Sequence, residues 1–202
     1  MDAVTSTVDV IEDVLAILAI AAALATVWFL LFWTWFAFWR RRPVLAYAVM
    51  ASTLCGGVAA CVAWRSTLLR PRIEMAVWTQ AIGWTVIAVV AVFGTIADAQ
   101  IGIRVRSFMP FFDRSGRLEL VTTGAYGVVR HPIYAAGMWF QIGVFLVTGY
   151  TSILGAFAVF GLGALWFTRR EEERLMELLD DPNEYVRYRR AVPALFPRLV
   201  RD

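Results

Sequence analysis

The sequence lacks lysine altogether and contains only one histidine and two cysteines in 202 residues. Charged residues make up 17% of the chain, whereas a soluble domain carries about 25%. This shortage of charge, together with an apolar content of 60%, excludes an ordinary soluble domain and indicates a membrane protein. The chain also lacks a basic patch interleaved with aromatic residues, so it does not resemble a nucleic-acid-binding domain.

The few cysteines and the N-terminal charges exclude two further features. Cys55 and Cys61 lie six residues apart within one apolar run and have no histidine nearby, which favours buried small residues over a disulfide or a metal site. Four acidic residues and no basic residue precede the first apolar run. A signal peptide needs a basic start, so we expect this run to be retained as a membrane span.

Apolar runs are what the sequence has in abundance. A bilayer core of about 30 Å needs about 20 apolar residues as helix. Three runs meet this length, and two shorter ones, joined by "TGYTS", predict an antiparallel helical hairpin. The five predicted spans are 14–38, 44–64, 76–96, 133–147 and 153–167. Residues 98–130 are expected to form an interfacial loop with amphipathic pieces, and a charged helix broken near Pro182 is expected to follow the last span.

The distribution of arginine predicts the orientation of these spans. With the N-terminus outside, sixteen arginines lie on the cytoplasmic side and three, at positions 65, 70 and 72, lie outside. The reverse orientation inverts that ratio, so the positive-inside rule favours a cytoplasmic C-terminus. We therefore expect an all-α, polytopic membrane protein with about five transmembrane helices and a C-terminal amphipathic helix on the cytoplasmic side.

The single histidine lies in the stretch "GAYGVVRHPIYAAG", residues 124–137, at the start of the fourth span. His131 and Tyr134 are three residues apart and share a helix face, and Pro132 suits a first helical turn. An antiparallel hairpin brings the first residue of span four beside the last residue of span five. "RHPIY" should therefore meet the "RREEE" run, which combines donors for an anion with acceptors for a cation or for hydroxyls.

Two motifs around this hairpin resemble those of a known enzyme family. "TTGAYGVVRHPIYAAG" together with "REEERLMELLDDPNEYVRYRRAVPALFPRL" is similar to the isoprenylcysteine carboxyl methyltransferases and their phospholipid methyltransferase relatives. The resemblance covers residues 121 to about 199. It implies a methyltransferase that uses S-adenosyl-L-methionine and has no Rossmann domain.

The resemblance also implies which residues form the site. It implies catalytic roles for Arg130 and Glu173 and no metal. The cofactor-binding residues that it implies are Gly124, Tyr126, Arg130, His131, Tyr134, Glu172, Glu173 and Tyr185. The methyl acceptor would be a lipophilic molecule that arrives from the bilayer, such as an isoprenylcysteine carboxylate, a phospholipid amine or a small hydrophobic thiol or acid. From the apolar runs, and not from the resemblance, we expect residues 1–98 to supply three N-terminal spans and 99–202 the catalytic part of one integral domain. The absence of lysine indicates a GC-rich bacterial source, and thus a bacterial inner membrane.

Two other functions fit parts of the same pattern. An NADPH-dependent membrane reductase of the sterol reductase type also carries an R-H-P-x-Y element, but its members usually lack the paired glutamates. A non-catalytic membrane scaffold would use Arg130 and His131 only as interfacial anchors, and the glutamates as a solvated helix face. Binding of S-adenosylhomocysteine, of NADPH or of neither distinguishes the three.

Overall fold

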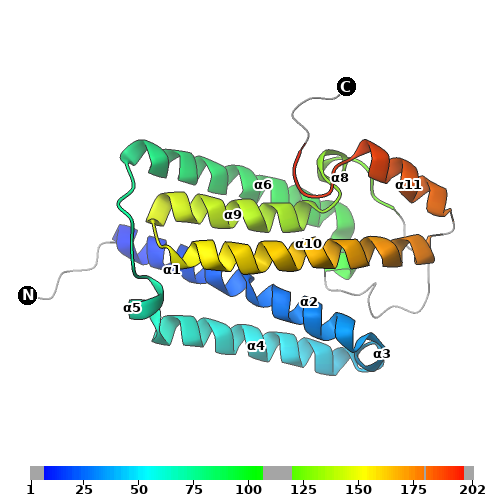
Figure 1. The fold of residues 1–202 in the computed structure, drawn as a ribbon, viewed down its shortest axis with the longest axis horizontal. Helices are drawn as coiled ribbons and strands as arrows, with labels where there is room; N and C mark the ends of the chain where they lie inside the picture. Colours follow the sequence, from blue (N-terminus) through cyan, green and yellow to red (C-terminus); the bar gives the residue numbers. More distant parts are fainter. Residues whose placement is uncertain (1–6, 107–119, 180, 198–202) are drawn as a thin grey trace, which may run out of the picture.

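The structure, a computed structural model, describes residues 7–106, 120–179 and 181–197, and these residues form helices and connections without a named strand (Figure 1). Four helical segments are long and apolar enough to cross a membrane: Thr7–Thr34, Pro43–Ala63, Val77–Ile101 and Ser152–Glu177. A fifth, Pro132–Thr148, is apolar but shorter. The prediction of an all-α, polytopic membrane protein is confirmed.

The first span is kinked at its centre. It consists of α1 (Thr7–Ala22) and α2 (Leu24–Thr34), and the short α3 (Phe36–Trp39) follows. At the kink the amide of Ala23 bonds to the carbonyl of Ile20 instead of the carbonyl of Ala19. The side chain of Gln141, which is fully buried, donates to the freed Ala19 carbonyl over 3.1 Å. A neighbouring helix thus satisfies the backbone group that the kink releases.

The second and third spans are α4 (Pro43–Ala63) and α6 (Val77–Arg106), with α5 (Arg65–Leu68) between them. Helix α6 continues ten residues beyond the expected end of its span. The interfacial stretch predicted for 98–130 is therefore helical up to Arg106, because "ADAQIGIRVR" contains no proline and only one glycine. The short helix α8 (Ala125–Val128) ends the stretch, and residues 107–119 lie outside the described residues.

The predicted antiparallel hairpin is formed by α9 (Pro132–Thr148) and α10 (Ser152–Leu178). Gly149 ends α9 with a φ of 70°, and a Cβ atom there would lie 2.0 Å from the carbonyl oxygen of Ile73, so the tight turn requires glycine. Helix α10 runs beyond the apolar stretch through the "RREEE" run. The last helix, α11 (Pro182–Ala191), begins after a break at Leu179, as the proline predicts.

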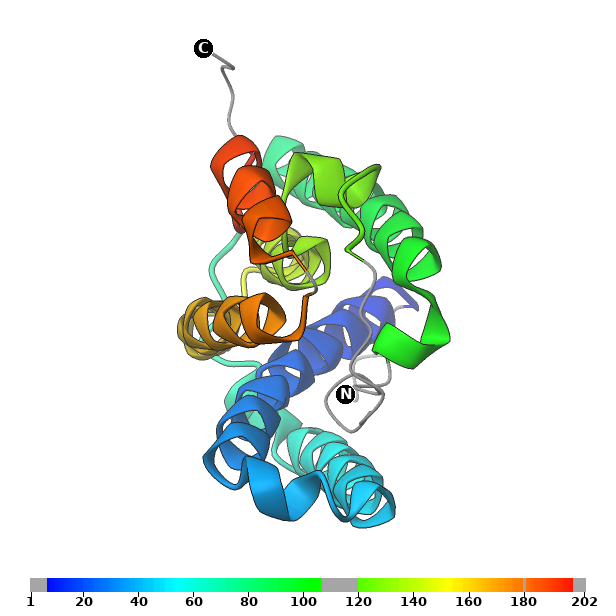
Figure 2. The ribbon, with the colours of Figure 1, turned by 90° about the vertical axis from the view of Figure 1, so that its right-hand side faces the viewer.

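Helix α9 lies at the centre of the bundle and contacts α1, α6 and α10 (Figure 2). Its 17 residues span about 26 Å. Its closest neighbour is α6. A Cβ atom on Gly83 of α6 would lie 2.8 Å from the carbonyl oxygen of Gly143, and one on Gly143 would lie 3.1 Å from that of Gly83. Small residues at this crossing let two backbones approach closely, a common way to pair helices in membranes.

The two ends of the bundle carry different groups. At one end, the side chain of Arg72 pairs with the buried Glu12 at 2.7 Å, and its backbone forms an isolated antiparallel β-bridge with Tyr150. The hydroxyl of Tyr150 donates to Asp13. Helices α3, α8 and α11 lie toward the opposite end (Figure 1). The arginines near position 70 and those near positions 40 and 190 are thus separated by the length of the bundle.

Candidate functional site

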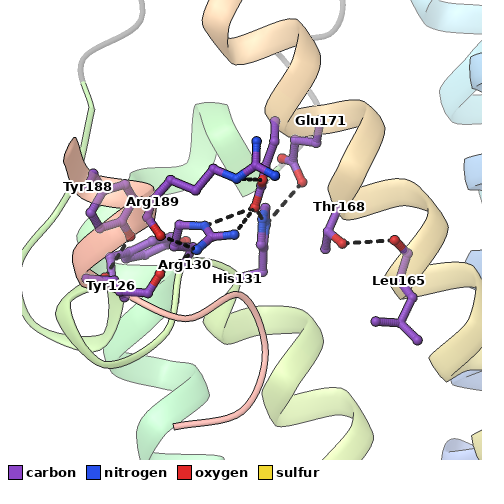
Figure 3. A network of polar contacts seen from close by, with 10 residues as sticks. Tyr126, Arg130, His131, Leu165, Thr168, Glu171, Tyr188 and Arg189 are labelled. Atoms are coloured by element: carbon purple, nitrogen blue, oxygen red, sulfur yellow. Dashed lines mark hydrogen bonds and ion pairs between the residues drawn. The ribbon is translucent and has the colours of Figure 1, made fainter. Parts of the chain in front are cut away.

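The start of α9 and the charged extension of α10 meet at the end of the bundle that carries α11 (Figure 3). His131 is the N-cap residue of α9, and Pro132 occupies its first turn, where no amide hydrogen is needed. Because α10 is antiparallel to α9 and continues past the apolar stretch, its glutamates reach the level of Arg130 and His131. The hairpin therefore joins the two halves of the sequence pattern.

Glu172 is the centre of the resulting polar network. Its side chain is 7% exposed. One carboxylate oxygen, Oε1, accepts hydrogen bonds from Nε and Nη2 of Arg130 at 2.9 and 2.7 Å, and it lies 3.0 Å from Nε2 of His131. The other oxygen lies 3.5 Å from Nε of Arg189 on α11. A buried carboxylate is stable only when such partners compensate for its lost hydration.

His131 is held between two carboxylates. Its Nε2 atom lies near Glu172, and its Nδ1 atom lies 3.5 Å from Oε2 of Glu171. Burial lowers the pKa of this imidazole, but the hydrogen bonds and charges of Glu171 and Glu172 outweigh burial and raise the pKa above its usual value. The network therefore favours the protonated form of His131.

Glu171 is the more exposed of the two carboxylates beside His131. Its side chain is 38% exposed, yet its Oε2 atom is buried and makes no hydrogen bond of standard geometry to a described residue. The phenol of Tyr134 also faces this carboxylate. The ring of Tyr134 stacks on His131 at 5.9 Å and packs edge-on against Phe29 and Phe167. A partly exposed carboxylate thus lies beside a wall of aromatic rings.

Three further tyrosines surround the network. Tyr188 on α11 donates from its hydroxyl to the carbonyl of Tyr126 on α8 over 2.7 Å. Burial raises the pKa of Tyr188 to about 12, and it also raises the pKa values of Tyr126 and Tyr185. All three phenols are therefore neutral at physiological pH. They can donate hydrogen bonds or form walls, but they do not act as bases there.

Gly124 shapes the approach to the site. Its φ is 60°, and a Cβ atom there would lie 1.9 Å from Nε2 of Gln100. The amide group of Gln100, on α6, donates to the carbonyl of Thr123 over 3.1 Å and accepts from the amide of Ala125 over 2.9 Å. Glycine is therefore required by close approach as well as by backbone conformation. The sequence did not point to Gln100, because nothing in its surroundings marks a contact 25 residues away.

Most of the predicted site residues lie together, and one lies apart. Glu173 is 57% exposed and pairs with Arg170 at 3.1 Å on the outer face of α10. Glu171 takes its place beside His131. The buried stripe of α10 contains a signal for this choice, because Phe167 and Thr168 are buried and a helix repeats its faces after about four residues. The same face therefore reaches Glu171 and Glu172. The residues that the structure does bring together are Tyr126, Arg130, His131, Tyr134, Glu172 and Tyr185, while Gly124 lies against Gln100 at the start of α8.

Among the described residues, no three or more histidine, cysteine, aspartate or glutamate side chains are grouped so as to hold a metal ion. The model of the phospholipid methyltransferase family matches residues 78–179, just over half of the chain.

The chain belongs to the phospholipid methyltransferase family. The matched residues contain all of α8, α9 and α10 and nearly all of α6, and thus Arg130, His131 and the three glutamates. The resemblance seen in the sequence is therefore confirmed at the level of the membrane methyltransferase family. No curated protein and no solved structure matches the chain significantly. Helix α11 lies outside the matched residues, although it supplies Tyr185, Tyr188 and Arg189 to the network.

Proposed function

We propose that the protein is an S-adenosyl-L-methionine-dependent methyltransferase that acts on a lipophilic acceptor at the boundary between membrane and cytoplasm. The observation that carries this proposal is the meeting of Arg130, His131 and Glu172 across the α9–α10 hairpin, with the partly exposed carboxylate of Glu171 beside them. Membership in a methyltransferase family supports the reaction class.

The residues at this site fit the cofactor's charged end. S-adenosyl-L-methionine carries an ammonium group, and the carboxylate of Glu171 is 38% exposed, whereas that of Glu172 is 7% exposed and occupied by Arg130. We assign Glu171 to that ammonium, with Tyr126 and Tyr134 as walls. When bound, the cofactor supplies an activated methyl group on a sulfonium. The protein then has to hold the acceptor in line and exclude water, which apolar and aromatic surroundings favour.

The distribution of arginine supports a cytoplasmic position of the site. Helices α3, α8 and α11 lie at the same end of the bundle, and Arg40, Arg130 and Arg189 follow or belong to these helices. Arg72 forms a β-bridge with Tyr150, in the turn between α9 and α10 at the other end. The positive-inside rule favours the arginine-rich end on the cytoplasmic side, where such a cofactor is available. A lipophilic acceptor would reach this end from the surrounding bilayer.

Calorimetry on the purified protein in lipid nanodiscs tests the proposal. We expect binding of S-adenosylhomocysteine and none of NADPH. Glu171→Gln should weaken that binding by about 10- to 150-fold, which corresponds to a charged hydrogen bond of about 1.5–3 kcal/mol. Glu177→Gln is the matched control, since Glu177 lies on the same helix, is 63% exposed and pairs only with Arg174 among the described residues.

The other outcomes are equally informative. Binding of NADPH alone would support the hypothesis of a reductase, and binding of neither ligand would support that of a non-catalytic scaffold. A loss of S-adenosylhomocysteine binding with Glu173→Gln but not with Glu171→Gln would support the cofactor-binding role predicted for Glu173 and reject our assignment of Glu171. Transfer of a labelled methyl group to phosphatidylethanolamine or to an N-acetyl-S-prenylcysteine would then distinguish an amine acceptor from a carboxylate acceptor.

A further inference from the structure

Arg130 uses most of its hydrogen-bond donors on acceptors of the protein itself. Its Nε and Nη2 atoms donate to Glu172, and its Nη1 atom donates to the carbonyl oxygens of Arg189, over 3.1 Å, and of Val192. A guanidinium has five N–H groups, so these contacts use four of them. The side chain is only 8% exposed. Little donor capacity remains for the carboxylate of a ligand.

The backbone around Arg130 is engaged in the same way. The amides of Arg130 and His131 donate to the carbonyl oxygens of Pro193 and Ala194 over 2.8 and 3.0 Å. These two amides precede α9, where free N–H groups would otherwise attract an anion. Backbone and side chain of one residue thus bind consecutive carbonyls of the same C-terminal segment.

Apolar contacts continue this attachment along α9. Leu195 is 2% exposed and packs in a buried cluster with Val129 and Met138. The ring of Phe196 packs edge-on against Trp139, two turns into the helix, at 6.5 Å. With the bond from Tyr188 to the carbonyl of Tyr126, residues 188–196 form a continuous attachment across α8 and α9, which we call the C-terminal clasp.

We propose that Arg130 is a positioning residue, which bonds the C-terminal clasp to the start of α9 and does not contact the ligand itself. These bonds hold Glu172 and His131 in place. Arginine suits this role because its planar fork can bond a carboxylate and two carbonyls at once, whereas the ammonium of lysine is a single point. Glu171, which Arg130 does not bond, then remains for the ligand. The part of this proposal that concerns ligand binding depends on the proposed function.

A comparison of two ligands separates positioning from direct contact. S-adenosylhomocysteine and its decarboxylated analogue differ only in the carboxylate that Arg130 would bind directly. If Arg130 acts by positioning, Arg130→Gln weakens both ligands by the same factor, at least tenfold, and leaves the ratio of their affinities within twofold of the wild-type ratio. If Arg130 contacts the carboxylate, the variant loses the preference for S-adenosylhomocysteine, and the proposal is overturned.

Hydrogen exchange tests the clasp without any ligand. In the ligand-free protein, Arg130→Gln should speed exchange at least tenfold in peptides that cover 126–131 and 188–196. Arg187→Gln is the matched control, because this arginine on α11 is 69% exposed and contacts only Asp181 among the described residues. Unchanged exchange in Arg130→Gln would overturn the clasp, whatever the ligand results.

Two further outcomes have defined meanings. If Arg130→Gln does not fold, Arg130→Lys serves instead: it keeps the charge near Glu172 but cannot reach both carbonyls, and it should show the same faster exchange. If the wild-type protein binds neither ligand, the proposed function fails, while the exchange measurement still decides whether Arg130 fastens the clasp.

Discussion

The strongest test of the network is the removal of charge from Glu172. Glu172→Gln preserves the size of the side chain but leaves Arg130, which is 8% exposed, without its ionic partner. Loss of one member of a buried pair costs about 3–5 kcal/mol, since the remaining charge stays buried. At about 2–4 °C per kcal/mol for a chain of this length, Tm should fall by about 6–20 °C.

Glu173→Gln is the control for this measurement. Glu173 is the next residue on the same helix, but both it and its partner Arg170 are about half exposed. An exposed pair contributes about 0.3–0.5 kcal/mol, so Tm should change by less than about 2 °C. Unfolding can be followed in nanodiscs through labelling of the buried thiol of Cys61, in a background that carries Cys55→Ser. Equal falls in Tm for the two variants would refute the central position of Glu172.

Three other predictions concern the pH dependence, the helix crossing and the orientation. The pKa of His131 is raised in the folded protein, so its contribution to stability is fully present below its unfolded pKa of about 6.5 and is lost as pH rises through the folded pKa. His131→Gln should therefore flatten this part of a plot of Tm against pH. An unchanged slope would contradict the prediction. Gly83→Val should lower Tm by several degrees through a clash with α9, whereas Gly94→Ala, whose Cβ would meet only one carbon atom at 3.5 Å, should be nearly neutral. Reporter fusions should give a cytoplasmic signal after Arg42 and the opposite signal at Pro71; a cytoplasmic signal at Pro71 would contradict five crossings.

The parts of the fold that the sequence predicted are those set by local signals. The short "TGYTS" link predicted the α9–α10 hairpin, and Pro182 predicted the break before α11. The kink at Ala23 was not predictable, because the carbonyl of Ala19 that it frees is bonded by Gln141, 122 residues further along the chain. The extra length of α6 was missed because scattered polar residues were interpreted as a loop, although nothing in that stretch breaks a helix.

The sequence predicted which motifs lie next to each other in the candidate site, but not which face of α10 is turned toward Arg130. The hairpin determines that the glutamates of α10 meet Arg130, yet a helix turns by about 100° per residue, so three consecutive glutamates cannot all face the same neighbour. The buried residues one turn earlier, Phe167 and Thr168, determine which glutamates face the site. This is why Glu171 and Glu172, and not Glu173, lie beside His131.

The balance of charge explains why the network suits a cation. Arg130 and Arg189 balance Glu171 and Glu172 in number, but Arg189 is 54% exposed, so solvent screens its charge and the surroundings of His131 keep an excess of negative charge when His131 is neutral. A proton on His131 removes this excess, in agreement with its raised pKa. An ammonium beside Glu171 would remove the same excess. We therefore infer that the proton of His131 and a cationic ligand group compensate the same charge, so that binding of such a group lowers the pKa of His131 and favours release of its proton.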